Sequence, residues 1–90
     1  MVRSIENLLN ELRALKHGKK MLNPYLLLGF VRRAGYSAKV NEDGRMEIYR
    51  GDGTKLMNHE KRPVSFQNKK TDLYPGEYKK IIDALVEDLE

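Results

Sequence analysis

The stretch 36-YSAKVNEDGRMEIY-49 decides the fold. Apolar side chains alternate with polar ones before Asp43-Gly44, and the alternation resumes after it with Met46 and Ile48. Asp-Gly between two alternating runs favours a type I′ hairpin, because both central residues of that turn need a positive φ. We therefore expect two antiparallel strands whose outer face shows polar side chains to water, namely Ser37, Lys39, Arg45, Glu47 and Tyr49, with Gln67 joining them from a third strand.

A third strand follows a second turn, 51-GDG-53. Residues 54–57 and residues 64–67 both have strand-like composition, and Pro63 means that the second candidate begins only after it. The residues between the two candidates, 58-NHEKR-62, form a polar loop.

Two helices are expected before the hairpin. Ser4 precedes an apolar stripe at helical spacing, so a leading helix should span residues 4–17 and end at Gly18. Asn23-Pro24 marks the start of a second helix over residues 24–34. Its apolar residues occupy most of the circumference, so we expect burial on more than one side, with only Arg32 and Arg33 facing solvent.

A last helix begins at Pro75 and carries the most regular apolar stripe of the chain. Its final turn holds Glu87, Asp88 and Glu90, which oppose the helix dipole and should let the end fray. The expected fold is α+β, in the order α-α-β-β-β-α: a three-stranded antiparallel sheet with helices packed on one face. Residues 1–90 should form a single domain.

Composition excludes several classes of protein. Hydrophobic residues make up 40% of the 90 residues, too many for a disordered tail. There is no cysteine, which excludes disulfides, thiolate nucleophiles and Cys-based metal sites, and there are only two histidines, His17 and His59. We therefore expect no metal and no cofactor. The longest apolar run, residues 25–31, is too short to span a membrane, and no signal-peptide core precedes it. We expect a cytoplasmic protein without a membrane partner.

The distribution of charge points to a phosphate-bearing partner. The formal net charge is +4, but residues 13–70 carry fourteen Lys or Arg against five Asp or Glu. Cations concentrated in this way favour nucleic-acid binding, because neutralising phosphates releases counterions. The expected contact residues cluster at the last helix and the loops before it: Lys55, Lys61, Arg62, Lys69, Lys70, Lys79 and Lys80. Tyr49 or Tyr74 can stack on bases or bond to sugar edges.

Candidates for catalysis are few. His59 lies beside Glu60, Lys61 and Arg62, where an imidazole can take a proton from a ribose hydroxyl while the cations bind the phosphate. A lone loop histidine is more often simply solvated. The serines and the Glu42-Asp43 pair fit helix-capping, strand and turn roles, so we assign no catalytic residue.

Four segments together resemble the HicA family of small messenger-RNA-cleaving toxins, whose fold resembles the double-stranded-RNA-binding domain. They are 27-LLGFVRRAGY-36, 44-GRMEIYRGDG-53, 64-VSF-66 and 72-DLYPGEYKKII-82. The resemblance implies a HicA-like core over residues 24–85, to which the leading helix is an addition. The family's general-base histidine lies at the start of the second strand, where this chain has Met46 or Glu47. A Glu there can in principle abstract a proton, but the resemblance implies a related scaffold without ribonuclease activity.

We therefore expect a small non-catalytic module that binds nucleic acid, with duplex RNA favoured over DNA. The alternative is a protein-interaction module, such as a small inhibitor or regulatory subunit, docking through the leading helix or a sheet edge. A helix-turn-helix made of the first two helices is disfavoured, because the second is too apolar to offer polar groups to bases.

Overall fold

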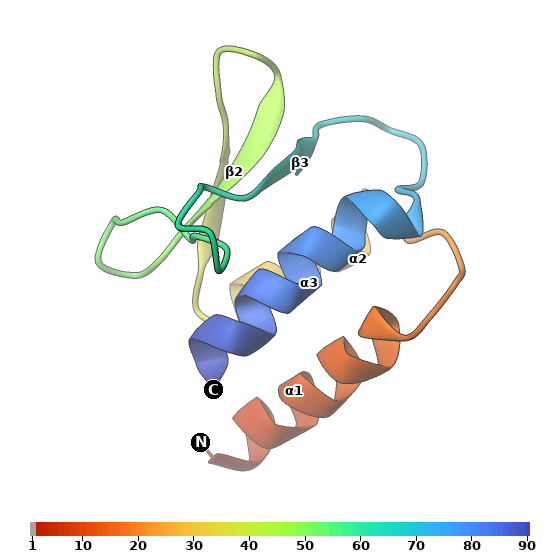
Figure 1. Ribbon diagram of the computed structural model, residues 1–90, viewed down its shortest axis with the longest axis vertical. Helices are drawn as coiled ribbons and strands as arrows, with labels where there is room; N and C mark the ends of the chain where they lie inside the picture. The colour runs from red at the N-terminus through yellow and green to blue at the C-terminus, as the bar shows by residue number, and fades with distance from the viewer. Residues whose placement is uncertain (1) are drawn as a thin grey trace.

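The computed structural model describes residues 2–90, with side chains from residue 6 onward. It confirms the expected α+β fold and element order (Figure 1). The elements are α1 (Val2–Lys16), α2 (Pro24–Arg33), β1 (Ser37–Val40), β2 (Arg45–Tyr49), β3 (Ser65–Gln67) and α3 (Pro75–Leu89). Among the described helices, none has the length and apolar character needed to cross a membrane.

The three strands form an antiparallel sheet in the order β1-β2-β3. Ala38 lies opposite Ile48, and Met46 lies opposite Phe66, so the alternating apolar residues share the face toward the helices. The alternation thus set the register, since a one-residue slip would turn these side chains to water. Val40 is the exception, because it lies at the end of the edge strand β1 and is 51% exposed.

The turn between β1 and β2 is not the expected type I′ turn. Gly44 has a φ of +76°, but Asp43 is not among the residues with positive φ. The Gly44 amide donates to the Asn41 carbonyl (3.1 Å), and the Asn41 amide donates to the Arg45 carbonyl (2.8 Å). This is a three-residue loop in which a type I turn is followed by a left-handed glycine. The Asn41 side chain supports it by accepting from the Asp43 and Arg45 amides, both at 2.9 Å.

The third strand is the second of the two expected candidates, and it begins after Pro63. Residues 54–57 form no strand of their own. They nevertheless enter the core, because the fully buried Leu56 donates its amide to the Ile48 carbonyl (2.8 Å) and accepts from the Val64 amide (3.1 Å). This segment therefore fills the space between β2 and the residue that precedes β3.

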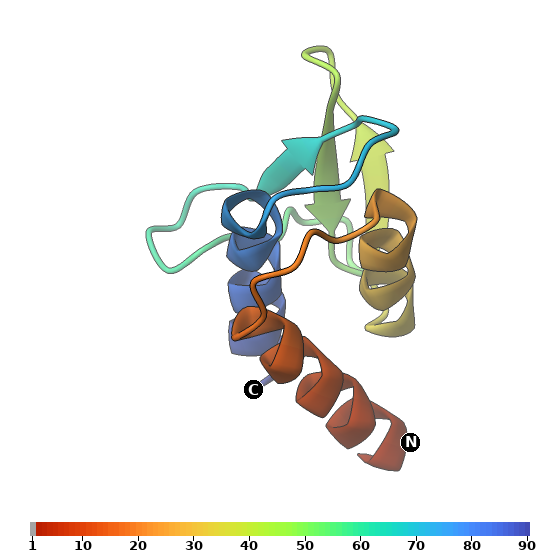
Figure 2. The same cartoon turned by 90° about the vertical axis from the view of Figure 1, so that its right-hand side faces the viewer.

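The helices lie on one side of the sheet, and α1 lies farthest from it (Figure 2). Helix α2 packs on β1, α3 packs on β3, and α1 packs on α3 and α2. Leu8 and Leu12 of α1 are buried in the core, so the apolar stripe of the leading helix covers its own domain. The helix begins at Val2 rather than at Ser4, and ends at Lys16.

The connection between α1 and α2 is joined to the connection between β3 and α3. Leu22 and Leu73 exchange two backbone hydrogen bonds of 2.9 and 2.7 Å. The buried Tyr78 adds a third contact, because its hydroxyl donates to the Lys20 carbonyl (2.7 Å). These contacts hold the start of α2 beside the start of α3.

Helix α2 departs from the expectation that it would be buried on more than one side. Asn23 caps it as expected, accepting from the Tyr25 amide at 2.8 Å. However, only Pro24, Leu27 and Val31 are buried, whereas Tyr25 is 73% exposed and Leu26 is 59% exposed. The reason is that its neighbours, β1 and α1, cover only one face of this helix.

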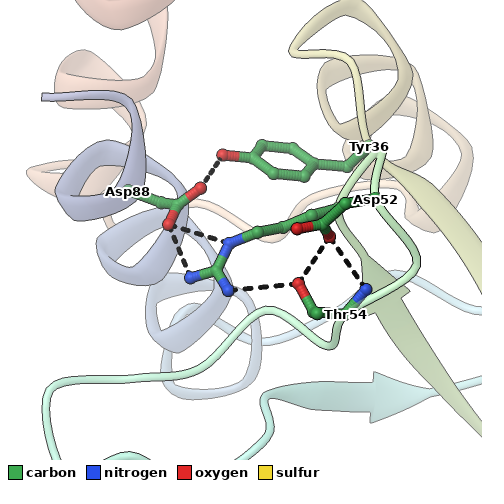
Figure 3. A network of polar contacts seen from close by, with 5 residues as sticks. Tyr36, Asp52, Thr54 and Asp88 are labelled. Carbon is green, nitrogen blue, oxygen red and sulfur yellow. Dashed lines mark hydrogen bonds and ion pairs between the residues drawn. The ribbon is translucent and has the colours of Figure 1, made fainter.

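Helix α3 buries the expected stripe and extends to Leu89, although its last turn is acidic. Cations from other elements offset the negative charge of that turn. Arg50 holds Asp88 with two hydrogen bonds of 2.7 and 3.1 Å, and the Tyr36 hydroxyl donates to the same carboxylate (Figure 3). Arg13 pairs with Glu90. The hydrogen bonds from Arg50 hold the pKa of Asp88 below its usual range. Burial, together with the bond to Asp88, raises the pKa of the Tyr36 hydroxyl.

Candidate nucleic-acid interface

A surface hollow of about 320 Å³ lies between α3 and the loop that precedes β3. We call it the basic hollow. Cations from three separate segments line it: Arg45 from β2, Arg62 from the loop and Lys80 from α3. His59, Asp83 and Glu87 contribute the other ionisable side chains. The fold therefore brings two of the expected contact residues, Arg62 and Lys80, to one place.

The loop that carries Arg62 is ordered by one asparagine. The Asn58 side-chain oxygen accepts from the amides of Glu60 (2.9 Å) and Arg62 (3.0 Å), and the Asn58 amide donates to the Arg62 carbonyl (2.9 Å). Asparagine suits this role because its short side chain reproduces a backbone acceptor. Lys61 completes the turn with a φ of +61°. The loop thus presents His59, Lys61 and Arg62 outward.

Arg45 is fixed by the neighbouring strand. Its Nε donates to the Ser65 hydroxyl (2.8 Å), and its Nη2 donates to the Ser65 carbonyl (3.0 Å). A guanidinium has five N–H donors, so others remain for a ligand. An arginine held in this way loses little side-chain entropy when it binds a phosphate oxygen.

Ion pairing in the basic hollow differs between its cations and its carboxylates. Within residues 6–90, no carboxylate lies at ion-pair distance from Arg45, Arg62 or Lys80. Of the two carboxylates, Asp83 pairs with Lys16 at 3.3 Å, whereas Glu87 has no such partner among these residues. The hollow therefore offers unpaired cations beside one available carboxylate.

Lys55 and Lys69 lie elsewhere and are already paired. Lys55 forms an ion pair with Glu47 at 3.0 Å, and this hydrogen bond raises the pKa of Lys55. The Glu47 carboxylate, the residue considered as a base, is only 14% exposed in this pair. Neither side chain lines the basic hollow.

Lys69 forms its pair at the start of α3. It contacts Glu77 at 3.0 Å and lies 5.2 Å from the centre of the Tyr74 ring. The bond from Lys69 lowers the pKa of Glu77, whose carboxylate also accepts from the Tyr74 amide (3.2 Å). Glu77 therefore occupies part of the start of α3 and pairs with the expected contact residue there, Lys69.

The remaining expected cations are dispersed. Lys61 is exposed on the loop beside the basic hollow, and Lys79 is half-buried next to Lys80 on α3. Lys70 lines a different hollow, next to Tyr25 of α2. Tyr49 has Lys39 over its ring, 5.6 Å from the centre. The seven expected residues thus do not all line one surface hollow.

Two basic side chains of the hollow, those of Arg45 and His59, were not among the expected contacts. Arg45 was assigned only to the polar face of the sheet, and its place here depends on pairing between β2 and β3. His59 was weighed as a base and set aside; its side chain is 75% exposed, 3.8 Å from Glu60. Within the described part of the chain, no group of His, Asp and Glu side chains is arranged to hold a metal ion.

The chain matches no family model, no curated protein and no solved structure. The resemblance to HicA toxins therefore stays a prediction.

Proposed function

We propose that the protein binds nucleic acid through the basic hollow and the lysines beside it. The observation that carries this proposal is the arrangement of Arg45, Arg62 and Lys80, three cations from different segments that line one hollow and have no carboxylate partner within residues 6–90. Paired surface cations contribute little to phosphate binding, because their own carboxylates compete. Unpaired ones keep their counterions until a phosphate displaces them. Lys61, exposed on the loop beside the hollow, and Lys79, half-buried beside Lys80 on α3, would supply further cations next to it.

Duplex RNA is the ligand class that this surface fits best. A-form RNA is recognised mostly through phosphates and 2′-hydroxyls, which calls for cations next to hydrogen-bond acceptors. Glu87 supplies such an acceptor in the basic hollow, where its carboxylate can accept from a 2′-hydroxyl that DNA lacks. The resemblance to a family with a double-stranded-RNA-binding-domain-like fold favours the same ligand.

The test is fluorescence anisotropy with duplex RNA, duplex DNA and single-stranded RNA of one sequence, over a series of salt concentrations. For the wild type we expect the logarithm of the affinity to fall linearly with the logarithm of salt. Replacing both Arg62 and Lys80 by Gln should make that slope shallower by roughly 2, since each lost phosphate contact removes about one counterion. Glu87→Ala, which removes the acceptor, should leave the salt slope unchanged and reduce the preference for duplex RNA over duplex DNA.

The matched control replaces Lys55 and Lys69 by Gln. This variant removes the same formal charge, but from cations that Glu47 and Glu77 already pair. If both double variants lose the same affinity and the same salt slope, the basic hollow is not the binding site, and the effect follows from the net charge alone. The same samples, recovered after incubation and run on a denaturing gel, should contain full-length RNA, because we assign no catalytic residue; cleavage that His59→Ala abolishes would contradict this.

A further inference from the structure

The exposed face of α2 is unusually apolar at its start. Tyr25 and Leu26 are 73% and 59% exposed, and Met21, just before the helix, is 46% exposed. Gly29 lies one turn later on the same face, where an added Cβ would meet no atom within 4 Å. Large apolar side chains gathered on one surface typically mark an interaction site rather than a solvated face.

This face borders a hollow of about 290 Å³, which we call the α2 groove. Its lining is mainly apolar and comes from Tyr25, Leu28, Met46 and Phe66, while Lys70 stands among its polar residues. Ligand pockets usually measure about 300–1,000 Å³, so this groove holds one or two side chains rather than a cofactor. The start of α2 is held beside it by the hydrogen bonds between Leu22 and Leu73.

The charged side chains that line the α2 groove, Lys69 and Lys70, are both cationic. Residues 12–41, which include all of α2, contain no Asp or Glu. Within residues 6–90, neither Lys70 nor Arg32, one turn beyond Leu28, has a carboxylate at ion-pair distance. Lys69 is paired with Glu77, and the nearest carboxylate to Lys70 in sequence is the exposed Asp72. A partner that complements this surface must join apolar side chains to carboxylates.

We propose that the α2 groove binds an acidic, amphipathic peptide segment of another protein. One apolar side chain of the peptide enters the groove between Leu28 and Phe66, and a second packs on Tyr25 and Leu26. Carboxylates of the peptide then reach Lys70 and Arg32. This surface shares no residue with the basic hollow, so the inference stands independently of the proposed function. It also differs from docking through α1, whose apolar stripe is buried in the core.

The probe is a phage-displayed library of random short peptides, selected on the immobilised full chain. We expect the enriched peptides to combine aliphatic or aromatic residues with Asp or Glu. A fluorescein-labelled copy of one enriched peptide should bind Tyr25→Ala/Leu26→Ala at least about tenfold more weakly, which is the loss of roughly 1.4 kcal/mol of contact. Lys70→Glu should weaken it by a similar factor and reduce the gain in affinity that each additional peptide carboxylate gives.

Two controls keep the outcome unambiguous. Val40→Ala removes an exposed apolar side chain of β1 that does not line the groove, and Lys61→Glu reverses a charge outside it; both should bind like the wild type. Thermal melts of all variants establish that they are folded.

Several results would overturn the proposal. Selection that yields no peptide, or peptides without acidic residues, would reject the stated chemistry. Retained binding in Tyr25→Ala/Leu26→Ala would reject the surface. Sedimentation showing a dimer that this same variant abolishes would assign the groove to a second copy of the chain, and a loss of single-stranded RNA binding confined to this variant would assign it to nucleic acid.

Discussion

The buried stripe of α1 allows a sharp comparison of two identical substitutions. Leu12 of α1 is fully buried against the core, whereas Leu26 of α2 is 59% exposed. Both lie in helices, so Leu→Ala changes helix propensity equally at the two positions. At a buried position the substitution typically costs about 2–5 kcal/mol, because the lost side chain leaves a cavity. At an exposed position the cost is usually within about 0.5 kcal/mol.

The free energies of unfolding are measured by urea denaturation followed by circular dichroism. A loss of about 2–5 kcal/mol is a large part of the roughly 5–15 kcal/mol that stabilises a typical domain. In a domain of this size, it should lower the melting temperature by at least about 8 °C. If Leu12→Ala melts like the wild type, α1 does not pack on α3, and the leading helix becomes available as the docking surface that the sequence also allowed. Equal losses at both positions would show that α2 is covered by a second molecule.

Other predictions concern the carboxylate at the end of α3 and two glycines. Because hydrogen bonds from Arg50 lower the pKa of Asp88, its contribution to stability is present above the ordinary carboxyl pKa and is lost as pH falls through the lowered pKa. Asp88→Asn should therefore be less stable near neutral pH and should lose less stability on acidification, as read from urea midpoints at a series of pH values. Gly44→Ala should cost about 1–2 kcal/mol in the same assay, because its φ is +76°. Gly29→Ala, in open space on α2, should instead stabilise the protein by about 0.5–1 kcal/mol. A stabilising Gly44→Ala or a destabilising Gly29→Ala would contradict the backbone conformation described at that position.

Local patterns predicted the elements well. The alternation around Asp43-Gly44 gave the pairing of β1 with β2, Pro63 placed the start of β3, and the stripe of α3 was buried as expected. Each of these signals lies within a few residues along the chain, which is why they could be interpreted without knowledge of the fold. The turn type was wrong because Asp-Gly also suits a three-residue loop, in which Gly44 alone takes a positive φ and Asp43 does not.

Properties that depend on contacts between separate elements of the fold were harder to predict from the sequence. The helical period showed that α2 could be buried all round, but not that its neighbours would cover only one face. The availability of Lys55 and Lys69 depended on Glu47 and Glu77, each eight residues away along the chain and across a turn. The basic hollow required β2, the loop and α3 to be in place. Charge composition thus indicated the kind of partner, whereas the positions of unpaired cations came only from the fold.

The paired hydrogen bonds between Leu22 and Leu73 carry a consequence for how the chain folds. They close a loop of roughly fifty residues that contains α2 and the whole sheet, and the entropy lost on closure grows with loop length. The hairpin of β1 and β2 can form without that closure, since its contacts are local. We therefore expect the hairpin to form early in folding. The contact between the α1–α2 connection and the β3–α3 connection should form late, so the α2 groove is completed only in the last step of folding.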